Sequence, residues 1–411
     1  MYLRKINFWF LSSLLISIVV VIPIITVFTS FFEDTSNYYQ ILKDTFLVEY
    51  ISNSLILLIC VLVLTFVLGT SSAYLVSFYT FPLSNFFKWA LILSFAVPPY
   101  IYAFSLTAFF ENYGTLYSIL KNLFGNANYN QHIPKFDGLL GAILSLSFSL
   151  FAYVYILARA SFFYQSQNLV DLGRSLGFSK LKSFYSLILP AARPAIVTGL
   201  SLVAMETLAE FGAVDFFSIN TLTTGIYNAW ITFDDLAFAN RISFFFLIFI
   251  FAIFILENLS RKRAKYHSNT KGGFKQKEKF QLSGAKAFLA FLICFLIFFL
   301  SFLFPLSQML YWTIKFPENF FDLQVITLTL NTIYLALLSS LVLIVFSLIS
   351  NYGNRVSKNK GLNILSTLSI SGYAIPGIIL AVAFISFIAW FDENIVQALG
   401  FLSIKNIFIG Y

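Results

Sequence analysis

Residues 171–190 read DLGRSLGFSKLKSFYSLILP, a polar stretch between two long apolar runs at 138–164 and 194–215. The pattern predicts a short amphipathic helix, a break at Gly177, a second short helix, and a proline stop at Pro190 before the next apolar run. Two apolar runs joined by such a stretch indicate membrane helices connected by a structured loop.

The basic residues of this loop place it on the cytoplasmic side of a membrane, where loops are enriched in lysine and arginine. They are Arg174, Lys180 and Lys182. A structured loop of this kind can lie in a groove of a soluble partner. Composition alone favours an ordinary solvated loop over a docking site.

The whole chain has the composition of a membrane protein. Of its 411 residues, 59% are hydrophobic and only 11% are charged, whereas soluble domains carry about 25% charged residues. A spanning helix needs about 20 mostly apolar residues. We therefore predict an all-α, polytopic membrane protein with nine spans, at residues 8–32, 52–79, 87–110, 138–164, 194–215, 242–259, 286–312, 328–350 and 363–390. The first run is too long for a signal peptide and lacks a small-residue cleavage site.

Orientation follows from the loops. Loops after even-numbered spans are basic and those after odd-numbered spans are acidic, which predicts a cytoplasmic N-terminus in the inner membrane. The same rule accounts for the net charge of +8, so nucleic acid is not an expected partner, whereas membrane lipid is. The polar stretch 261–285 is predicted to be a cytoplasmic linker. The predicted organisation has five parts: a first spanning helix with a periplasmic segment (1–51), a first multi-span domain (52–260) and this linker (261–285). Another spanning helix with a periplasmic segment (286–327) and an incomplete second multi-span domain (328–411) follow.

An internal repeat has a spacing of 278 residues. Asn53 opens the second span and Asn331 the eighth, and Pro98 and Pro376 lie in the third and ninth spans. Proline inside a spanning helix tends to kink it, so we expect matched kinks in two parallel halves. The same spacing carries the loop at Asp171 beyond the last residue. We therefore expect a truncated second half, and a complete protein on the order of 530 residues with twelve spans.

Acidic side chains in the fifth span point to a transport path. Glu206 and Glu210 are four residues apart, which predicts one helix face. Carboxylates at membrane depth usually face a bundle interior or a water-filled path, although a position near the outer interface would also accommodate them. Cys60 and Cys294 fall inside apolar runs and are expected to be packing residues. We expect no stable metal site, no cofactor and no catalytic residue.

The loop resembles the coupling loop of binding-protein-dependent ABC importers, in which Glu-Ala-Ala is followed by glycine and then by Ile-x-Leu-Pro. That resemblance implies the type I importer permease fold, docking of the loop into a cleft of a separate cytoplasmic ATPase subunit, and no ATP hydrolysis by this chain. No phosphate-binding G-x-x-x-x-G-K-[ST] motif is present. The residues at the positions of the family pattern are Asp171, Leu172, Gly173, Gly177, Leu187, Leu189 and Pro190. Leu172 departs from the alanine of the pattern, and Asp171 is one methylene shorter than its glutamate.

The segments 205–214 and 221–230 resemble the ferric-iron branch of that family, which has two fused permease halves. There, an acidic residue followed by Phe-Gly precedes a threonine-rich stretch ending in Thr-Gly-Ile-Tyr. The resemblance implies ferric iron as cargo, a periplasmic binding protein that supplies selectivity, and Glu206 and Glu210 as transient contacts. Ferric iron is a hard cation that suits carboxylate oxygens.

Other functions remain open. The same permease class carries thiamine, polyamines, sulfate or phosphonates. A secondary transporter driven by an ion gradient is a further alternative, although inverted repeats are common there and the repeat here is parallel. A membrane enzyme lacks support, because the sequence contains neither a nucleophile motif nor a cluster of metal ligands.

Overall fold

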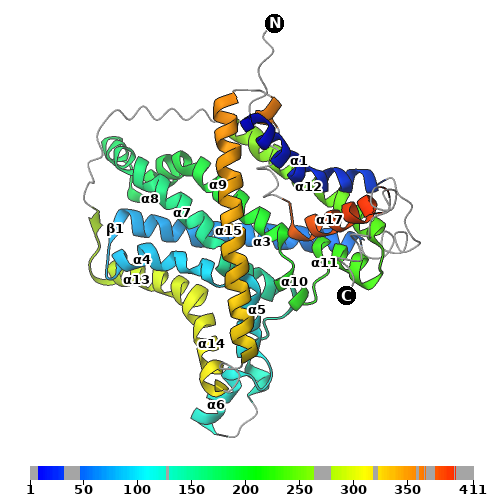
Figure 1. The fold of residues 1–411 in the computed structure, drawn as a ribbon. Coiled ribbons are helices and arrows are strands. Elements are labelled where there is room, and N and C mark those ends of the chain that lie inside the picture. The colour runs from blue at the N-terminus through cyan, green and yellow to red at the C-terminus, as the bar shows by residue number, and fades with distance from the viewer. Residues whose placement is uncertain are drawn as a thin grey trace. The chain divides into compact units, whose positions relative to one another are not determined.

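A computed structural model describes residues 8–31, 47–125, 129–262, 279–317, 323–357, 361–364, 366, 375–392 and 394, with only the backbone of 20, 30, 164–168, 253–262 and 354. The chain divides into two compact units. Unit 1 comprises residues 1–46, 225–250 and 312–411, and unit 2 comprises 47–224 and 251–311. Figure 1 shows that the described elements are almost all helices.

Each of the nine predicted spans contains helical residues, but not every one is a single helix of spanning length. Six are single helices long and apolar enough to cross a membrane: Phe8–Thr29, Leu47–Phe78, Gly138–Phe163, Lys180–Ala209, Gly284–Lys315 and Leu323–Gly353. The sixth and ninth predicted spans contain the shorter apolar helices Leu236–Ala252 and Gly377–Phe391. Part of the ninth, residues 367–374, lies outside the described residues.

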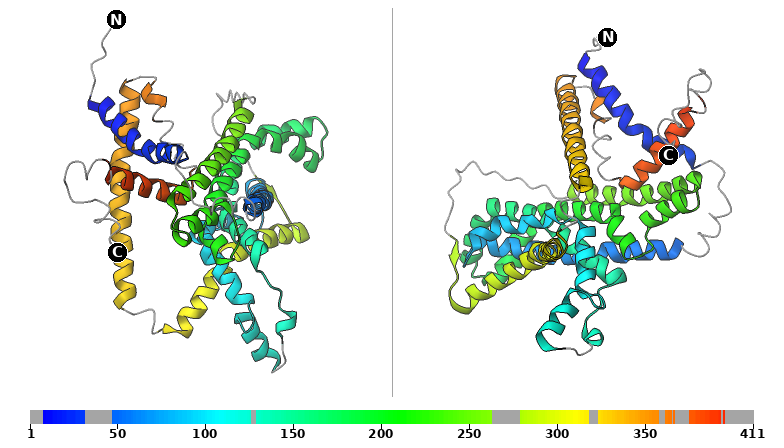
Figure 2. Two further views of the ribbon diagram at one scale, coloured as in Figure 1. Left: turned by 90° about the vertical axis from the view of Figure 1, so that its right-hand side faces the viewer. Right: turned by 60° about the horizontal axis from the view of Figure 1, so that its bottom comes forward.

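The third predicted span differs from expectation. Helix α4 (Ser84–Ala90) and the 3-10 turn Leu91–Ala96 are followed by α5 (Pro99–Phe110), and the two parts meet at an angle of 90°. The reason is the pair of prolines, because neither Pro98 nor Pro99 can donate a backbone hydrogen bond across the break. A short turn then leads into α6 (Thr115–Phe124), which projects from the rest of unit 2 in both views of Figure 2.

Three long helices form the centre of unit 2: α3 (Leu47–Phe78), α7 (Gly138–Ser175) and α9 (Leu189–Ala209). Their backbones approach closely at Val154 of α7. A Cβ atom added to Gly69 of α3 would lie 2.7 Å from the Val154 Cβ, and one added to Gly199 of α9 would lie 2.9 Å from its Cα. Small residues allow such close packing between membrane helices.

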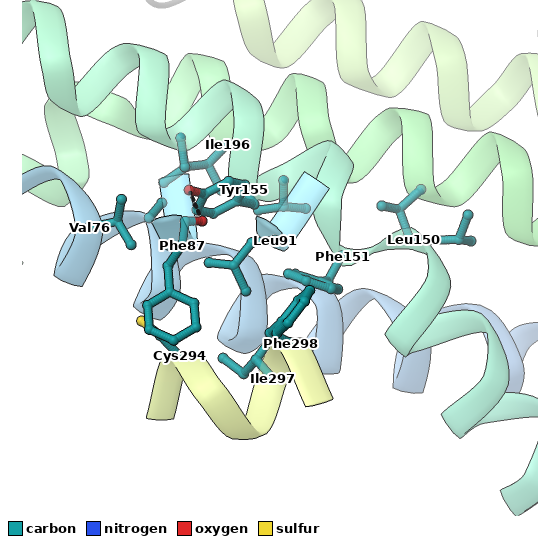
Figure 3. Close-up of a cluster of buried hydrophobic side chains, with 14 of the residues drawn as sticks. Val76, Phe87, Leu91, Leu150, Phe151, Tyr155, Ile196, Cys294, Ile297 and Phe298 are labelled. Carbon is teal, nitrogen blue, oxygen red and sulfur yellow. Dashed lines mark hydrogen bonds between the residues drawn. The ribbon is translucent and has the colours of Figure 1, made fainter. Parts of the chain in front are cut away.

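A fourth helix closes this core. Helix α13 (Gly284–Phe298) packs Cys294 and Phe298 against Phe87 and its neighbours (Figure 3). Cys294 is fully buried and Cys60 is half-buried against the same cluster, as expected of packing residues. The hydroxyl of Tyr155 donates to the backbone carbonyls of Phe87 and Lys88, which satisfies its polar group inside the core.

The chain continues from α13 through a π-helical turn (Phe299–Leu303) into α14 (Phe304–Lys315). A short parallel pairing joins β1 (Tyr79–Thr80), directly after α3, to β2 (Phe280–Gln281), just before α13. Among the described residues, this pairing is the only β-structure in an otherwise helical fold. It connects the end of α3 to residues 280–281, which lie inside the predicted linker 261–285.

Unit 1 contains α1 (Phe8–Ser30), α15 (Leu323–Ser357), α17 (Gly377–Phe391) and the first residues of α12 (Leu236–Lys262). Helix α1 contacts the last turns of α15, where the Ser13 hydroxyl donates to the Ile349 carbonyl at 3.4 Å. The Asn240 amide of α12 donates to the Ser386 hydroxyl of α17 at 2.6 Å.

Candidate functional site

The loop found in the sequence begins as the last turns of α7. At its end the Gly177 N–H donates to the Arg174 carbonyl at 3.0 Å and the Phe178 N–H to the Gly173 carbonyl at 2.8 Å. This is the Schellman pattern of a helix C-terminus, and Gly177 occupies the left-handed position with φ +66°. Glycine adopts that conformation without the steric cost that a Cβ atom brings.

A second helical segment follows at once. The Ser179 hydroxyl accepts a hydrogen bond from the Lys182 N–H and caps α8 (Lys180–Ser183). A π-helical turn, Phe184–Ile188, then leads directly into α9. The predicted proline stop at Pro190 is therefore wrong, because the helix continues to Ala209. The wide turn immediately before Pro190 accommodates the missing N–H.

The two arms of the loop pack tightly against each other. A Cβ atom on Gly173 would lie 2.3 Å from the Ser183 Oγ and 3.4 Å from the Leu187 Cδ1. The family pattern has alanine, another small residue, at this position. The end of α7 and the start of α9 thus form one closely packed corner, which we name the coupling loop (residues 171–190).

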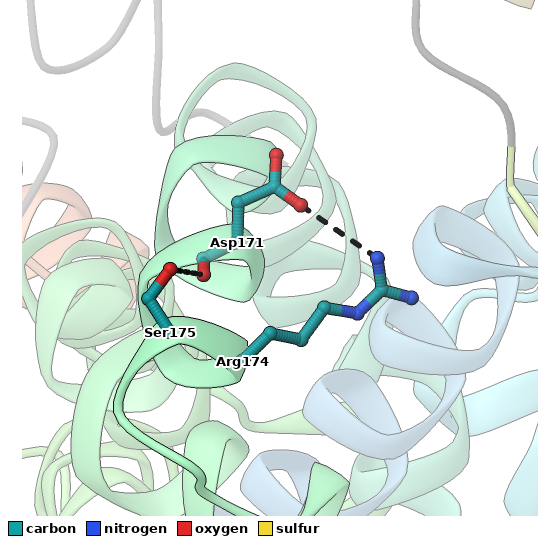
Figure 4. A network of polar contacts seen from close by, with 3 residues as sticks. All are labelled: Asp171, Arg174 and Ser175. Atoms are coloured by element: carbon teal, nitrogen blue, oxygen red, sulfur yellow. Dashed lines mark hydrogen bonds and ion pairs between the residues drawn. The ribbon is translucent and has the colours of Figure 1, made fainter.

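The coupling loop exposes large apolar side chains together with charges. Asp171 and Arg174 form a surface ion pair at 3.7 Å (Figure 4), which contributes little to stability. Leu189 is half-buried and Pro190 is exposed. The exposed apolar side chains are Leu172, Leu176, Leu181 and Tyr185, with 46%, 53%, 70% and 64% of their surface accessible. The sequence analysis singled out only Leu172. The other three could have been found as large apolar residues within a charged loop.

A segment distant in sequence supports the loop. Residues 279–282, which we name the strap, contain β2, and the Leu282 N–H donates to the Thr80 carbonyl at 3.0 Å. The ring of Phe280 lies under two cations of the coupling loop, 4.8 Å from the Arg174 Cζ and 5.0 Å from the Lys180 Nζ. Cation–π contacts of this length are attractive. Nothing in the local sequence indicated this contact.

The two glutamates do not share one helix face as predicted. Helix α9 ends at Ala209, and Glu210 has an extended backbone with ψ 129°. Its carboxylate accepts a hydrogen bond from the Ala213 N–H at 2.8 Å, at the start of α10 (Gly212–Phe216). The Glu206 carboxylate accepts from the Tyr153 hydroxyl at 3.2 Å. Both glutamates are half-buried. The two carboxylates have different hydrogen-bond partners, the Tyr153 hydroxyl and the Ala213 N–H.

The threonine-rich segment folds back onto Glu210. The Thr223 hydroxyl donates to the Glu210 carbonyl at 2.9 Å, just inside α11 (Leu222–Tyr227). The Asn53 amide of α3 donates to the Asn220 carbonyl at 2.9 Å. The first residues of α3, which the sequence marked only as a repeat, therefore hold this segment in place.

Each of the two prolines expected at a kink is the residue directly before a helix. Pro98 precedes α5 with φ −38° and ψ 152°, and Pro376 precedes α17 with φ −54° and ψ 138°. Residues 371–374, ahead of Pro376, lie outside the described residues. Among the described residues, no group of three or more His, Cys, Asp or Glu side chains could hold a metal ion.

Comparison with known proteins identifies the class. Residues 65–265 match the family model "Binding-protein-dependent transport system inner membrane component". The chain is 28% identical to the "Fe(3+)-transport system permease protein FbpB 2" of Haemophilus influenzae, over 65% of this chain and 48% of that protein. It is 26% identical to the "Putative ferric transport system permease protein FbpB 1" of the same organism, over 59% of this chain and 39% of that protein.

A third relative has a different named cargo. The chain is 26% identical to the "Sulfate transport system permease protein CysT" of Salmonella typhimurium, over 38% of this chain and 53% of that protein. The chain spans about half or less of the length of these curated relatives. The family match includes the coupling loop, and the described chain contains several apolar helices of spanning length. Over residues 65–265, this multi-pass chain is therefore similar to the inner-membrane components of binding-protein-dependent transport systems.

Proposed function

We propose that this chain is the transmembrane permease part of an ATP-driven importer that takes up ferric iron. A periplasmic binding protein would deliver the cargo, and a cytoplasmic ATPase subunit would dock on the coupling loop. The observation that carries the proposal is the geometry of that loop, a closely packed helical corner with exposed apolar side chains within a chain similar to this family.

The loop has the properties needed to transmit motion. Its apolar side chains can enter a groove of a partner, in the way that an amphipathic helix binds. Because Gly173 and Ser183 fix the two arms together, a displacement of the loop moves α7 and α9 as one body. Closure of the ATPase subunits would thereby switch the permease from inward-facing to outward-facing and admit the cargo.

Ferric iron is favoured over sulfate by the chemistry of α9. Two half-buried carboxylates, Glu206 and Glu210, lie at and just beyond its end, and carboxylates bind a hard cation but repel sulfate. Sulfate stays the second candidate, because one relative carries that name. We propose Glu206 as the transient contact and Glu210 as the residue that shapes the turn beside it.

The internal repeat, the domain boundaries and the cytoplasmic N-terminus belong to the same proposal. Moving the bounds of α3 by 278 residues gives 325–356, against 323–357 for α15. The same shift places Pro98 on Pro376 and the start of α5 on the start of α17. These agreements support two parallel halves, each with its own permease domain.

ATPase docking is tested with one pair of glycine variants. Gly177→Val puts a branched side chain on a residue with φ +66° at the coupling loop. Gly125→Val makes the same change at φ +88° after α6, in open space. We expect an ATPase subunit to co-purify with the wild type and with Gly125→Val, and to be lost from Gly177→Val. Equal co-purification of both variants would contradict docking on the loop, and a secondary transporter would recruit no ATPase at all.

Cargo is tested by uptake in cells that lack the native gene and carry the wild type or a variant. Radiolabelled ferric iron should accumulate with the wild type and fall with Glu206→Gln, while the exposed Glu111→Gln serves as a control. Labelled sulfate should not accumulate. If deletion of the chain leaves iron uptake unchanged and lowers sulfate uptake, the ferric assignment is wrong and sulfate replaces it.

A further inference from the structure

Three basic side chains gather where α3 ends. Lys88 lies on α4, Arg159 on α7 and Lys279 in the strap. The Arg159 Nη1 donates to the Lys88 carbonyl at 2.6 Å, and the Lys279 Nζ donates to the Val76 carbonyl in the last turn of α3. Residues from four separate elements of unit 2 therefore contribute to one patch.

The cations of this patch act on one another. The pKa of Lys279 is lowered to about 8, first by its burial and then by the positive charges of Lys88 and Arg159. The oxygens that these three side chains contact are neutral: the Asn85 side-chain carbonyl and the backbone carbonyls of Lys88 and Val76. All three side chains are half-buried, so water screens their repulsion less than at an open surface. An anion placed among them would offset that repulsion.

The surroundings indicate the depth of the membrane interface. Apolar side chains near Lys88 are exposed in the N-cap of α4, in α4 itself and in the turn that follows it. They are Leu83, Phe86, Trp89 and Leu93, with 59%, 49%, 69% and 43% of their surface accessible. The Arg159 guanidinium lies over the Trp89 ring, 5.4 Å from its centroid. Exposed tryptophan is typical of the boundary between lipid tails and headgroups. Basic groups at this boundary lie level with lipid phosphates.

We propose that Lys88, Arg159 and Lys279 form a binding site for the phosphate of an anionic phospholipid. The acyl chains would lie along the exposed apolar face of α4. This face favours a lipid over a soluble anion or an acidic protein surface, because only a lipid satisfies both the cations and the apolar side chains. Basic pockets between membrane helices bind anionic headgroups in this way. The site does not depend on the identity of the cargo.

Bound lipid would also support the strap. Because Lys279 adjoins Phe280, whose ring contacts two cations of the coupling loop, a headgroup that offsets the charge of Lys279 would hold the strap on the end of α3. This inference links the lipid composition of the membrane to the order of the coupling loop. The binding itself is measurable without any transport assay.

The test uses the purified full-length chain and native mass spectrometry, with phosphatidylglycerol and phosphatidylethanolamine of the same acyl chains. The wild type should retain phosphatidylglycerol preferentially. Lys88→Gln should weaken that retention about fivefold, the effect of one basic residue near an anionic surface. Lys121→Gln, an exposed residue on α6, is the matched control and should retain it as the wild type does.

Further variants and ligands separate the alternatives. Arg159→Lys should keep the preference and Arg159→Gln should lose it, with the thermal midpoint of each reporting whether it folds. Equal retention of the two lipids by the wild type would overturn the proposal. It would also fall if inorganic phosphate alone stabilised the wild type as strongly as phosphatidylglycerol. Loss of a co-purifying ATPase subunit in Lys88→Gln, with lipid retention unchanged, would make the patch a protein contact instead.

Discussion

Helices α3 and α15 occupy corresponding positions in the predicted repeat but have opposite surroundings. Both are long apolar helices, and a shift of 278 residues superimposes their bounds to within two residues. Twelve residues of α3 are buried, whereas every residue of α15 from 323 to 348 is exposed. Apolar composition is therefore enough to specify a spanning helix, but burial requires neighbours with complementary surfaces.

One small residue illustrates this difference. In α3, Gly69 lets α7 approach until backbone and side chain nearly touch. The corresponding residue of α15 is Ser347, which is exposed. Helix α15 makes a comparable close contact only near its end among the described residues, where a Cβ on Gly353 would lie 2.1 Å from the Ser13 Oγ of α1.

The largest expected effect comes from filling that contact. Gly69→Leu should destabilise the protein by about 1–3 kcal/mol or more, because the side chain would overlap Val154. Ser347→Leu, at the matched position of α15, should change stability by less than about 0.5 kcal/mol. Thermal unfolding in detergent measures both. Equal destabilisation by the two variants would show that α15 is packed as tightly as α3.

A smaller effect is expected at the first residues of the two helices. Asn53→Ala removes the hydrogen bond to the Asn220 carbonyl. This should lower the free energy of unfolding by about 0.5–1.5 kcal/mol. Asn331→Ala removes the equivalent side chain of α15, which is exposed, and should leave stability unchanged. The thermal midpoints of the two variants should therefore differ, and a loss at Asn331 would reveal a partner for α15.

The end of α3 provides the third comparison, because the strap pairs with β1 there. Phe280→Leu keeps the apolar bulk but removes the ring beneath Arg174 and Lys180. We expect amide hydrogen exchange in residues 176–183 to accelerate about two- to fivefold, equivalent to about 0.5–1 kcal/mol. Phe280→Trp should exchange at the wild-type rate, and so should Phe288→Leu, a change at an exposed ring of α13. Acceleration throughout α3 would instead indicate general destabilisation.

The smallest effect concerns pH. Lys279 has a pKa of about 8 in the folded protein, against an ordinary value of 10.5. Between these values the unfolded chain binds a proton that the folded chain does not, so stability rises as pH increases through that range. Partial exposure of the side chain keeps the gain small. Lys279→Gln should flatten this part of the stability curve, and an unchanged slope would assign it to another group.

The sequence analysis predicted the spans better than the site. The long apolar runs located six helices of spanning length, because length and hydrophobicity are properties of each segment alone. The turn at Gly177 was also predictable, since glycine after a helix favours a left-handed residue. The shared face of Glu206 and Glu210 was not, because α9 ends between them. The contact of Phe280 with the coupling loop joins residues about 100 positions apart, which no local pattern encodes.

By itself, the sequence determined that this is a multi-span membrane protein with a glycine-broken helical loop at 171–190, because those properties depend on composition and on short spacings. Only the tertiary structure decided which helices are packed and which surfaces stay open. It also brought the strap to the coupling loop and gathered three cations beside Trp89. The physical reason is that close packing and charge clustering depend on distances between segments, and folding alone sets those distances.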